Sequence, residues 1–253
     1  EIGDEGFWML AANLLGGTLL AATIAMVIAV PIAVGIALFI SHYAPPRLSK
    51  SIAFVIDLLA AIPSVIFGLW GYLTFAPFLV PLFEWLEDNL GFIPLFEDAS
   101  RTGRVLLTAS IVLAIMILPI ITSVSREVFL QTPRLHEEAS LALGATRWEM
   151  IRMSVFPFAR AGIISGIMLG LGRALGETMA VALVLSTGGL QWSLIRTGNN
   201  TIAAEIALNY PVAFGNRFTE LIAAGFVLFI ITLIVNLAAR AITARYKEFS
   251  GAN

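Results

Sequence analysis

The sequence contains no cysteine, only two histidines, and few charged residues, 13% of the chain. The absence of cysteine excludes disulfides, thiolate zinc sites and cysteine nucleophiles. The two histidines, His42 and His136, are not spaced as metal ligands, and there is no His-Glu-x-x-His motif. The low charge, with 58% hydrophobic residues, lies outside the usual balance of a soluble domain and indicates a membrane protein.

The sequence also lacks the phosphate-binding loop Gly-x4-Gly-Lys-Ser/Thr. The chain is therefore not expected to bind or hydrolyse ATP itself. No histidine lies inside an apolar run, so a membrane-embedded serine nucleophile would have no base. We expect no enzymatic activity and no cofactor in this chain.

Long apolar runs dominate what is present. A membrane helix needs roughly 20 mostly apolar residues. Five runs of that length are visible, at about Leu10–Ile40, Ser51–Tyr72, Val105–Val124, Ile163–Leu185 and Leu221–Ile242. Pro31 is an expected kink in the first and longest run. These runs predict an all-α polytopic membrane protein in which residues 1–253 form a single transmembrane domain.

Basic residues are divided unequally between the two sides of these runs. Four lie on one side, namely Arg101, Arg104, Arg196 and Arg217. Ten lie on the other, namely Arg47, Lys50, Arg126, Arg134, Arg147, Arg152, Arg160, Arg240, Arg245 and Lys247. Because the richer side usually faces the cytoplasm, we expect the C-terminus to be cytoplasmic and the N-terminus to lie outside. The chain begins at Glu1 with no basic segment or cleavage site before the first run, so we expect an upstream helix to be missing from this sequence.

The segments on the outer side contain acidic and aromatic residues that suit solvated connectors or interfacial anchoring. They include Glu84, Trp85, Glu87, Asp88, Glu97, Asp98, Trp192 and Tyr210. Residues 202–210, preceded by Thr201, predict a short helix on or in the outer face.

The cytoplasmic residues 131–157 predict a short amphipathic helix. Thr132 is expected to cap it, with Pro133 at its first position. Its apolar face would consist of Leu135, Ala139, Ala142 and Leu143. Such a helix suits a groove on a cytoplasmic partner, or alternatively a layer of lipid headgroups.

A break and a second helix follow directly. Gly144 lies where a left-handed residue would end the first helix. Thr146 and Glu149 have the spacing of a capping box, which predicts the start of the next helix.

This stretch resembles the Glu-Ala-Ala loop of ABC-importer permeases at Glu138, Ala139, Ser140, Gly144 and Pro157. The family pattern is Glu-Ala-Ala, three residues, Gly, nine residues, and Ile-x-Leu-Pro. Here Ser140 replaces the second alanine, and Ser154 and Phe156 replace the isoleucine and the leucine. These departures leave the short helix intact. In that family the loop couples the permease to its ATPase.

The resemblance extends over nearly the whole chain. Residues 60–71, 118–151, 172–184 and 200–207 are similar to the PstC-type permease subunits of phosphate ABC importers. The related PstA type is the nearest alternative. The resemblance implies the type I, or MetI-like, permease fold and a bacterial inner-membrane location.

The resemblance also implies a set of partners. A PstA-type permease would form the other half of the pathway, two copies of a PstB-type ATPase would bind ATP, and an external PstS-type protein would bind phosphate. The coupling segment, about residues 126–157, would contact the ATPase through Glu138, Ala139, Ser140 and Gly144. Membrane lipid would surround the complex, and no nucleic-acid partner is expected.

An arginine and a glutamate lie inside the fourth apolar run. Each charge costs roughly 2.5 to 3.5 kcal/mol at a helix centre, so Arg173 and Glu177 must face protein or water. Four residues apart, they can share one helix face, unless a helix ends between them. Arg173 would offer its planar fork to a passing oxyanion, and Glu177 would weaken that binding enough for release. The alternative is a buried ion pair that only fixes helix packing.

Other candidates are weaker or structural. Thr178 adjoins the charged pair, and Asp57 in the second run is a minor candidate for the substrate pathway. Gly162, Gly166 and Gly170 recur every four residues, a spacing that lets helix backbones pack closely in lipid.

Several functions stay open from sequence alone. Molybdate or sulfate could replace phosphate as the substrate. An ATP-independent secondary transporter or channel is possible in place of an ATP-driven importer, as is a purely regulatory membrane subunit.

Overall fold

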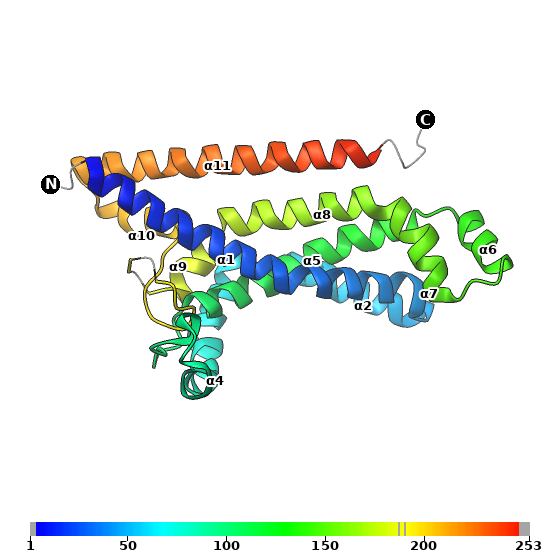
Figure 1. The fold of residues 1–253 in the computed structure, drawn as a ribbon, viewed down its shortest axis with the longest axis horizontal. Helices are drawn as coiled ribbons and strands as arrows, with labels where there is room; N and C mark the ends of the chain where they lie inside the picture. The colour runs from blue at the N-terminus through cyan, green and yellow to red at the C-terminus, as the bar shows by residue number, and fades with distance from the viewer. Residues whose placement is uncertain (1–3, 187, 190, 248–253) are drawn as a thin grey trace. The chain divides into compact units, whose positions relative to one another are not determined.

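A computed structural model describes residues 4–186, 188–189 and 191–247 of the protein. Every regular element in these residues is helical. The longer helices are α1 (Asp4–Leu38), α2 (Pro46–Ala60), α4 (Ala76–Leu90), α5 (Leu106–Leu130), α8 (Phe156–Gly176) and α11 (Asn216–Lys247) (Figure 1). The shorter helices are α3 (Ser64–Trp70), α6 (Arg134–Ala142), α7 (Arg147–Met150), α9 (Met179–Val184) and α10 (Ile202–Asn209).

Five helical stretches are long and apolar enough to cross a membrane, as the sequence predicted. They are Gly6–Tyr43, Ser64–Leu90, Leu106–Leu130, Arg147–Gly176 and Asn216–Ile242. Three π-helical turns, at Phe39–Tyr43, Gly71–Phe75 and Ile151–Val155, continue or join the α-helices of these spans. Helix α1 continues past Pro31 without ending.

The predicted second run, Ser51–Tyr72, is wrong as a single helix. Helix α2 ends at Ala60, and α3 begins after Pro63, which is extended at ψ 138°. Proline has no N–H to donate to a preceding turn and disfavours helical geometry in the residue before it, so the chain breaks here. The candidate span then runs on to Leu90, and Glu84, Trp85, Glu87 and Asp88 belong to α4 and not to a loop.

The described residues form two compact units. The first unit takes the described residues within 1–28, 62–116 and 173–233, and the second those within 29–61, 117–172 and 234–253. The first contains two apolar clusters, one around Leu79, Phe83, Val105 and Ile195 and the other around Leu14, Ile202 and Ala224. The second is built on Ala37, Leu38, Phe129, Met150, Ile151, Val155, Ala159 and Ile163.

Small residues form the buried face of α1. Alanines recur at every fourth position and are almost completely buried at Ala21, Ala25, Ala29, Ala33 and Ala37. Small side chains at this spacing let helices pack closely in a membrane, where the hydrophobic effect does not drive helices together. This row was not predicted from the sequence.

Candidate functional site

The fourth span ends at the charged pair. Arg173 lies half-buried in the last turn of α8, which ends at Gly176. Glu177 follows immediately and is 9% exposed. The predicted helix Ile163–Leu185 is therefore wrong in its second part, because the chain leaves the helix at Glu177 and resumes as α9.

Side chains at this break satisfy the backbone groups that it leaves open. The Glu177 carboxylate accepts a hydrogen bond from the Ala180 N–H at 3.2 Å, in the first turn of α9. The Thr178 hydroxyl donates to the Gly176 carbonyl at 3.1 Å. Free N–H groups favour an anion and free carbonyls favour a cation. Each of the two charges therefore lies at the helix end that suits its sign.

Helix α9 packs closely on the segment Ser64–Phe75. A Cβ atom added to Gly68 would lie 2.7 Å from the Ala180 Cα, and one added to Gly71 would lie 2.9 Å from a Val184 methyl. Real Cβ atoms do not approach so closely, so glycine at these positions permits the contact. The position of α9 thus depends on residues about 110 positions earlier in the chain.

Arg104 binds the other end of α9. From the sequence alone, it is only a basic residue of an outer loop. Its guanidinium donates to the Leu185 carbonyl at 2.7 Å and lies 5.1 Å from the centre of the Tyr72 ring. A cation at the last carbonyls of a helix is stabilising. In the sequence, Arg104 stands out only because it directly precedes an apolar run, and this position does not reveal that it binds the end of α9.

Arg173 has no hydrogen bond or ion pair within the described part of the chain, including with Glu177. Of the two arrangements that the sequence left open, a shared helix face and a helix end, the structure has the helix end, because α8 ends one residue before Glu177. The guanidinium therefore keeps its fork of N–H donors available, and this fork can bind two oxygens of one oxyanion.

The predicted break in the cytoplasmic segment is confirmed. Helix α6 is followed by Gly144 at φ +88° and then by α7. The Thr146 N–H donates to the Glu149 carboxylate at 2.7 Å, and the Glu149 N–H donates to the Thr146 hydroxyl at 3.3 Å. This reciprocal pair is the predicted capping box.

The predicted cap of α6 is wrong. The helix begins at Arg134, Pro133 flanks it, and no side chain caps it. The Thr132 hydroxyl is buried without a hydrogen-bond partner in the described residues. The helix starts one position later than expected, at Arg134 and not at Pro133, so Thr132 lies too early to reach the free N–H groups.

The predicted apolar face of α6 is uncovered. Leu135 is 74% exposed and Leu143 is 91% exposed, and Glu138, Ala139 and Ala142 are also exposed. Exposed apolar side chains gathered on one short helix are typical of a docking surface.

The two serines that depart from the family pattern contact each other. The hydroxyls of Ser140 in α6 and Ser154 in the π-helical turn lie 2.6 Å apart, so one donates to the other, and the His136 carbonyl, at 3.0 and 3.3 Å from them, accepts the remaining proton. An alanine and an isoleucine would make an apolar contact at these positions. The two departures are thus one feature, a polar link between α6 and the base of the fourth span.

The glycine row of α8 faces the second half of α5. The two helices are neighbours in Figure 1. Cβ atoms added to Gly162, Gly166 and Gly170 would lie 2.4, 3.0 and 2.8 Å from side-chain atoms of Val128, Val124 and Ile121 respectively. These glycines therefore allow close helix packing within this chain. Gly172 and Gly176 have open space around them.

Asp57 lies apart from the charged break in sequence and environment. It is exposed on α2 and accepts a hydrogen bond from the Ser123 hydroxyl at 3.0 Å.

The short outer helix is confirmed as α10, capped by the Thr201 hydroxyl, which accepts from the Ala204 N–H. Its buried Glu205 pairs with Arg217 and accepts from the Asn200 side chain. This network could not be foreseen, since its members come from a helix, a loop and the start of α11.

Known proteins resemble the chain over most of its length. The family described as binding-protein-dependent transport system inner membrane component matches residues 29–248. Phosphate transport system permease protein PstC 2 of Mycobacterium tuberculosis is 50% identical over 250 residues, which cover 94% of this chain and 75% of that protein. The PstC proteins of Mycobacterium leprae and Haemophilus influenzae are 47% and 41% identical, cover 95% and 93% of this chain, and are themselves covered to 77% and 76%.

Solved structures share the fold. The inward-facing MetNI methionine ABC transporter aligns with a TM-score of 0.66 at 18% identity, over 96% of this chain and 99% of that one. A bacterial alginate ABC transporter aligns with a TM-score of 0.66 at 17% identity, over 92% and 79%. The predicted MetI-like permease fold is thereby confirmed. The chain is a multi-pass protein that belongs to the family of binding-protein-dependent transport system inner membrane components.

Proposed function

We propose that the chain is the permease subunit of an ATP-driven importer of inorganic phosphate and forms half of its translocation pathway. The observation that carries this proposal is the 41 to 50% identity to phosphate permeases over more than nine-tenths of the chain. The chemistry of the charged break agrees with an anionic substrate.

Arg173 is the proposed anion ligand of this pathway. Its guanidinium is half-buried, carries no partner among the described residues, and stays charged at physiological pH. Glu177 and Thr178 shape the break in which it lies, and Asp57 is a lesser candidate. Because the Glu177 carboxylate is engaged by α9, its effect on the anion is an electrostatic one at a distance and not a competing ion pair.

The partners follow from the same proposal. The exposed apolar face of α6, with Glu138, Ala139 and Gly144, would dock into a PstB-type ATPase, two copies of which bind the ATP. A PstA-type permease would complete the pathway, and an external PstS-type protein would deliver phosphate. The C-terminus would be cytoplasmic, on the side with more basic residues.

Transport by the complete reconstituted importer tests the proposal. Uptake of labelled phosphate into vesicles should require ATP and the external binding protein, and excess sulfate or molybdate should not compete. Competition by either anion would instead favour a permease for that oxyanion. Uptake that persists without nucleotide would favour an ATP-independent transporter.

A further inference from the structure

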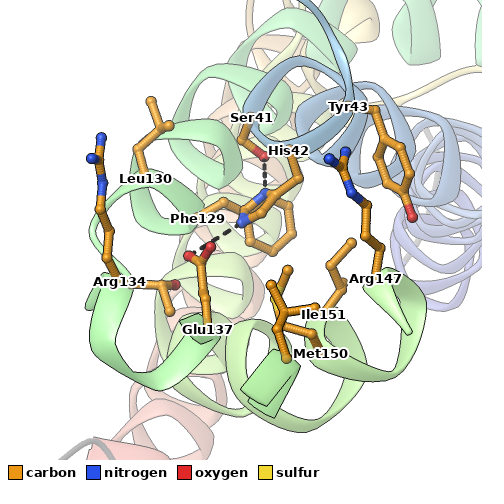
Figure 2. A pocket seen from close by; sticks show the side chains of 12 residues that line it. Ser41, His42, Tyr43, Phe129, Leu130, Arg134, Glu137, Arg147, Met150 and Ile151 are labelled. Atoms are coloured by element: carbon orange, nitrogen blue, oxygen red, sulfur yellow. Dashed lines mark hydrogen bonds and ion pairs between the residues drawn. The ribbon is translucent and has the colours of Figure 1, made fainter. Parts of the chain in front are cut away.

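A cavity of about 360 Å³ lies beside the coupling helix in the second unit (Figure 2). Tyr43, Leu130 and Arg147, which line it, are the terminal residues of three of the five candidate membrane spans. The cavity therefore lies at the ends of three candidate spans, on the side with more basic residues.

Unpaired cations surround this cavity. Arg134 and Arg147 line it from two sides, and neither forms a hydrogen bond or ion pair within the described residues. Between them, the His42 ring lies 3.6 Å from the Glu137 carboxylate and 2.7 Å from the Ser41 hydroxyl. Glu137 is the one carboxylate among the described lining residues, so permanent positive charges outnumber negative ones by two to one.

A buried threonine also lines the cavity. Thr132 is 5% exposed, and its hydroxyl has no hydrogen bond in the described residues. The hydroxyl oxygen itself is closed off from the cavity, so only the rest of the Thr132 residue borders it.

From these observations we infer that the cavity binds a phosphate group, supplied either by the headgroup of an anionic lipid or by free inorganic phosphate. Arginine forks bind phosphate oxygens in pairs, and basic pockets between membrane helices on the cytoplasmic side bind phospholipid headgroups. The bound group would link Arg134 at the start of α6 to Arg147 at the start of α7 and to the end of the first span. It would thereby fix the coupling helix. This inference is independent of which anion is transported.

Binding to the complete detergent-purified importer tests the inference in two arms. Native mass spectrometry would count retained dioleoyl-phosphatidylglycerol against dioleoyl-phosphatidylcholine, and equilibrium dialysis would measure labelled inorganic phosphate in an Arg173→Gln background. Arg134→Gln and Arg147→Gln should each weaken binding by about fivefold, the usual effect of one basic side chain near an anionic surface. Thr132→Val should leave binding unchanged, because the Thr132 hydroxyl does not reach the cavity.

Arg152→Gln is the matched control, since Arg152 is exposed near the same helix start but does not line the cavity. Selective loss of phosphatidylglycerol in Arg134→Gln and Arg147→Gln identifies a lipid headgroup, and selective loss of labelled phosphate identifies the free anion. Equal losses in Arg152→Gln, or no loss of either probe in Arg134→Gln or Arg147→Gln, would overturn the inference.

Discussion

The chain interrupts its helices in two contrasting ways, at Gly176–Thr178 inside the fourth apolar run and at Leu143–Thr146 directly after α6. The second break is made by local chemistry, a glycine at positive φ and a capping box. At the first, the Glu177 carboxylate and the Thr178 hydroxyl bind backbone groups of the break, and Gly68 and Arg104 from distant segments hold α9 in place. A helix break that is exposed to water can be specified by nearby residues alone. A break inside a membrane-spanning run leaves backbone N–H and C=O groups without water, so other parts of the fold must satisfy their hydrogen bonds.

The largest expected effect is on phosphate uptake when Arg173 is replaced, and it distinguishes a functional role of this charge from a structural one. Arg173→Gln should lower phosphate uptake by about a hundredfold, the upper range for losing a charge-assisted pair of hydrogen bonds. Arg173→Lys keeps the charge without the fork and should lose about tenfold. Uptake by the reconstituted importer is the measurement, and the variants should still co-purify with their partners. Failure to assemble would show that the charge is structural.

The packing beneath the first break gives the next effect. Gly162→Ala places a methyl group where the structure has Val128 at 2.4 Å, and overpacking should destabilise the protein by about 1 to 3 kcal/mol. Unfolding in detergent would measure this, with Gly172→Ala as a control that meets open space. Combining Gly162→Ala with Val128→Ala should recover most of the loss. No recovery would contradict direct α5–α8 packing at this position.

The second break should be sensitive to backbone conformation alone. No atom lies within 4 Å of a Cβ added to Gly144, so Gly144→Val acts only through the strain of its positive φ. We expect a cost of about 1 to 2 kcal/mol and a correspondingly lower yield of ATPase co-purified with the permease. Gly144→Asn is the control, since asparagine tolerates this conformation. Equal losses in both variants would indicate that a side chain, and not φ, disturbs docking.

The smallest effect concerns the polar link at the base of the second break. Ser140→Ala removes the 2.6 Å contact to Ser154 and should reduce ATPase attachment by about fivefold, the worth of about one hydrogen bond. Adding Ser154→Ile should restore attachment, because the pair then becomes apolar as in the family pattern. Ser51→Ala, which loses only a bond to its own helix, is the control. A double variant worse than Ser140→Ala would argue against a compensating pair.

The two breaks also mark what sequence reasoning could reach. The helical fold, the number of spans, the break at Gly144 and the capping box followed from composition and local spacing, whereas the cap predicted at Thr132 does not form. The span at Ser64–Leu90 was misplaced because hydropathy is continuous across Pro63 and only backbone geometry ends the helix there. The partners of Arg104 and the link between Ser140 and Ser154 depend on neighbours distant in sequence, which residue spacing does not reveal. The alanine row of α1 was visible in the spacing but was not predicted.

Modification of a single thiol tests the central claim most directly, that Arg173 lies on a water-filled route for an anion. The chain contains no cysteine, so Arg173→Cys would be its one thiol. In the assembled importer during ATP turnover, this thiol should react with hydrophilic methanethiosulfonates, and external phosphate with its binding protein should slow the reaction. The cationic aminoethyl reagent should restore part of the uptake, and the anionic sulfonatoethyl reagent should not. A thiol that stays unreactive in every nucleotide state would contradict the account.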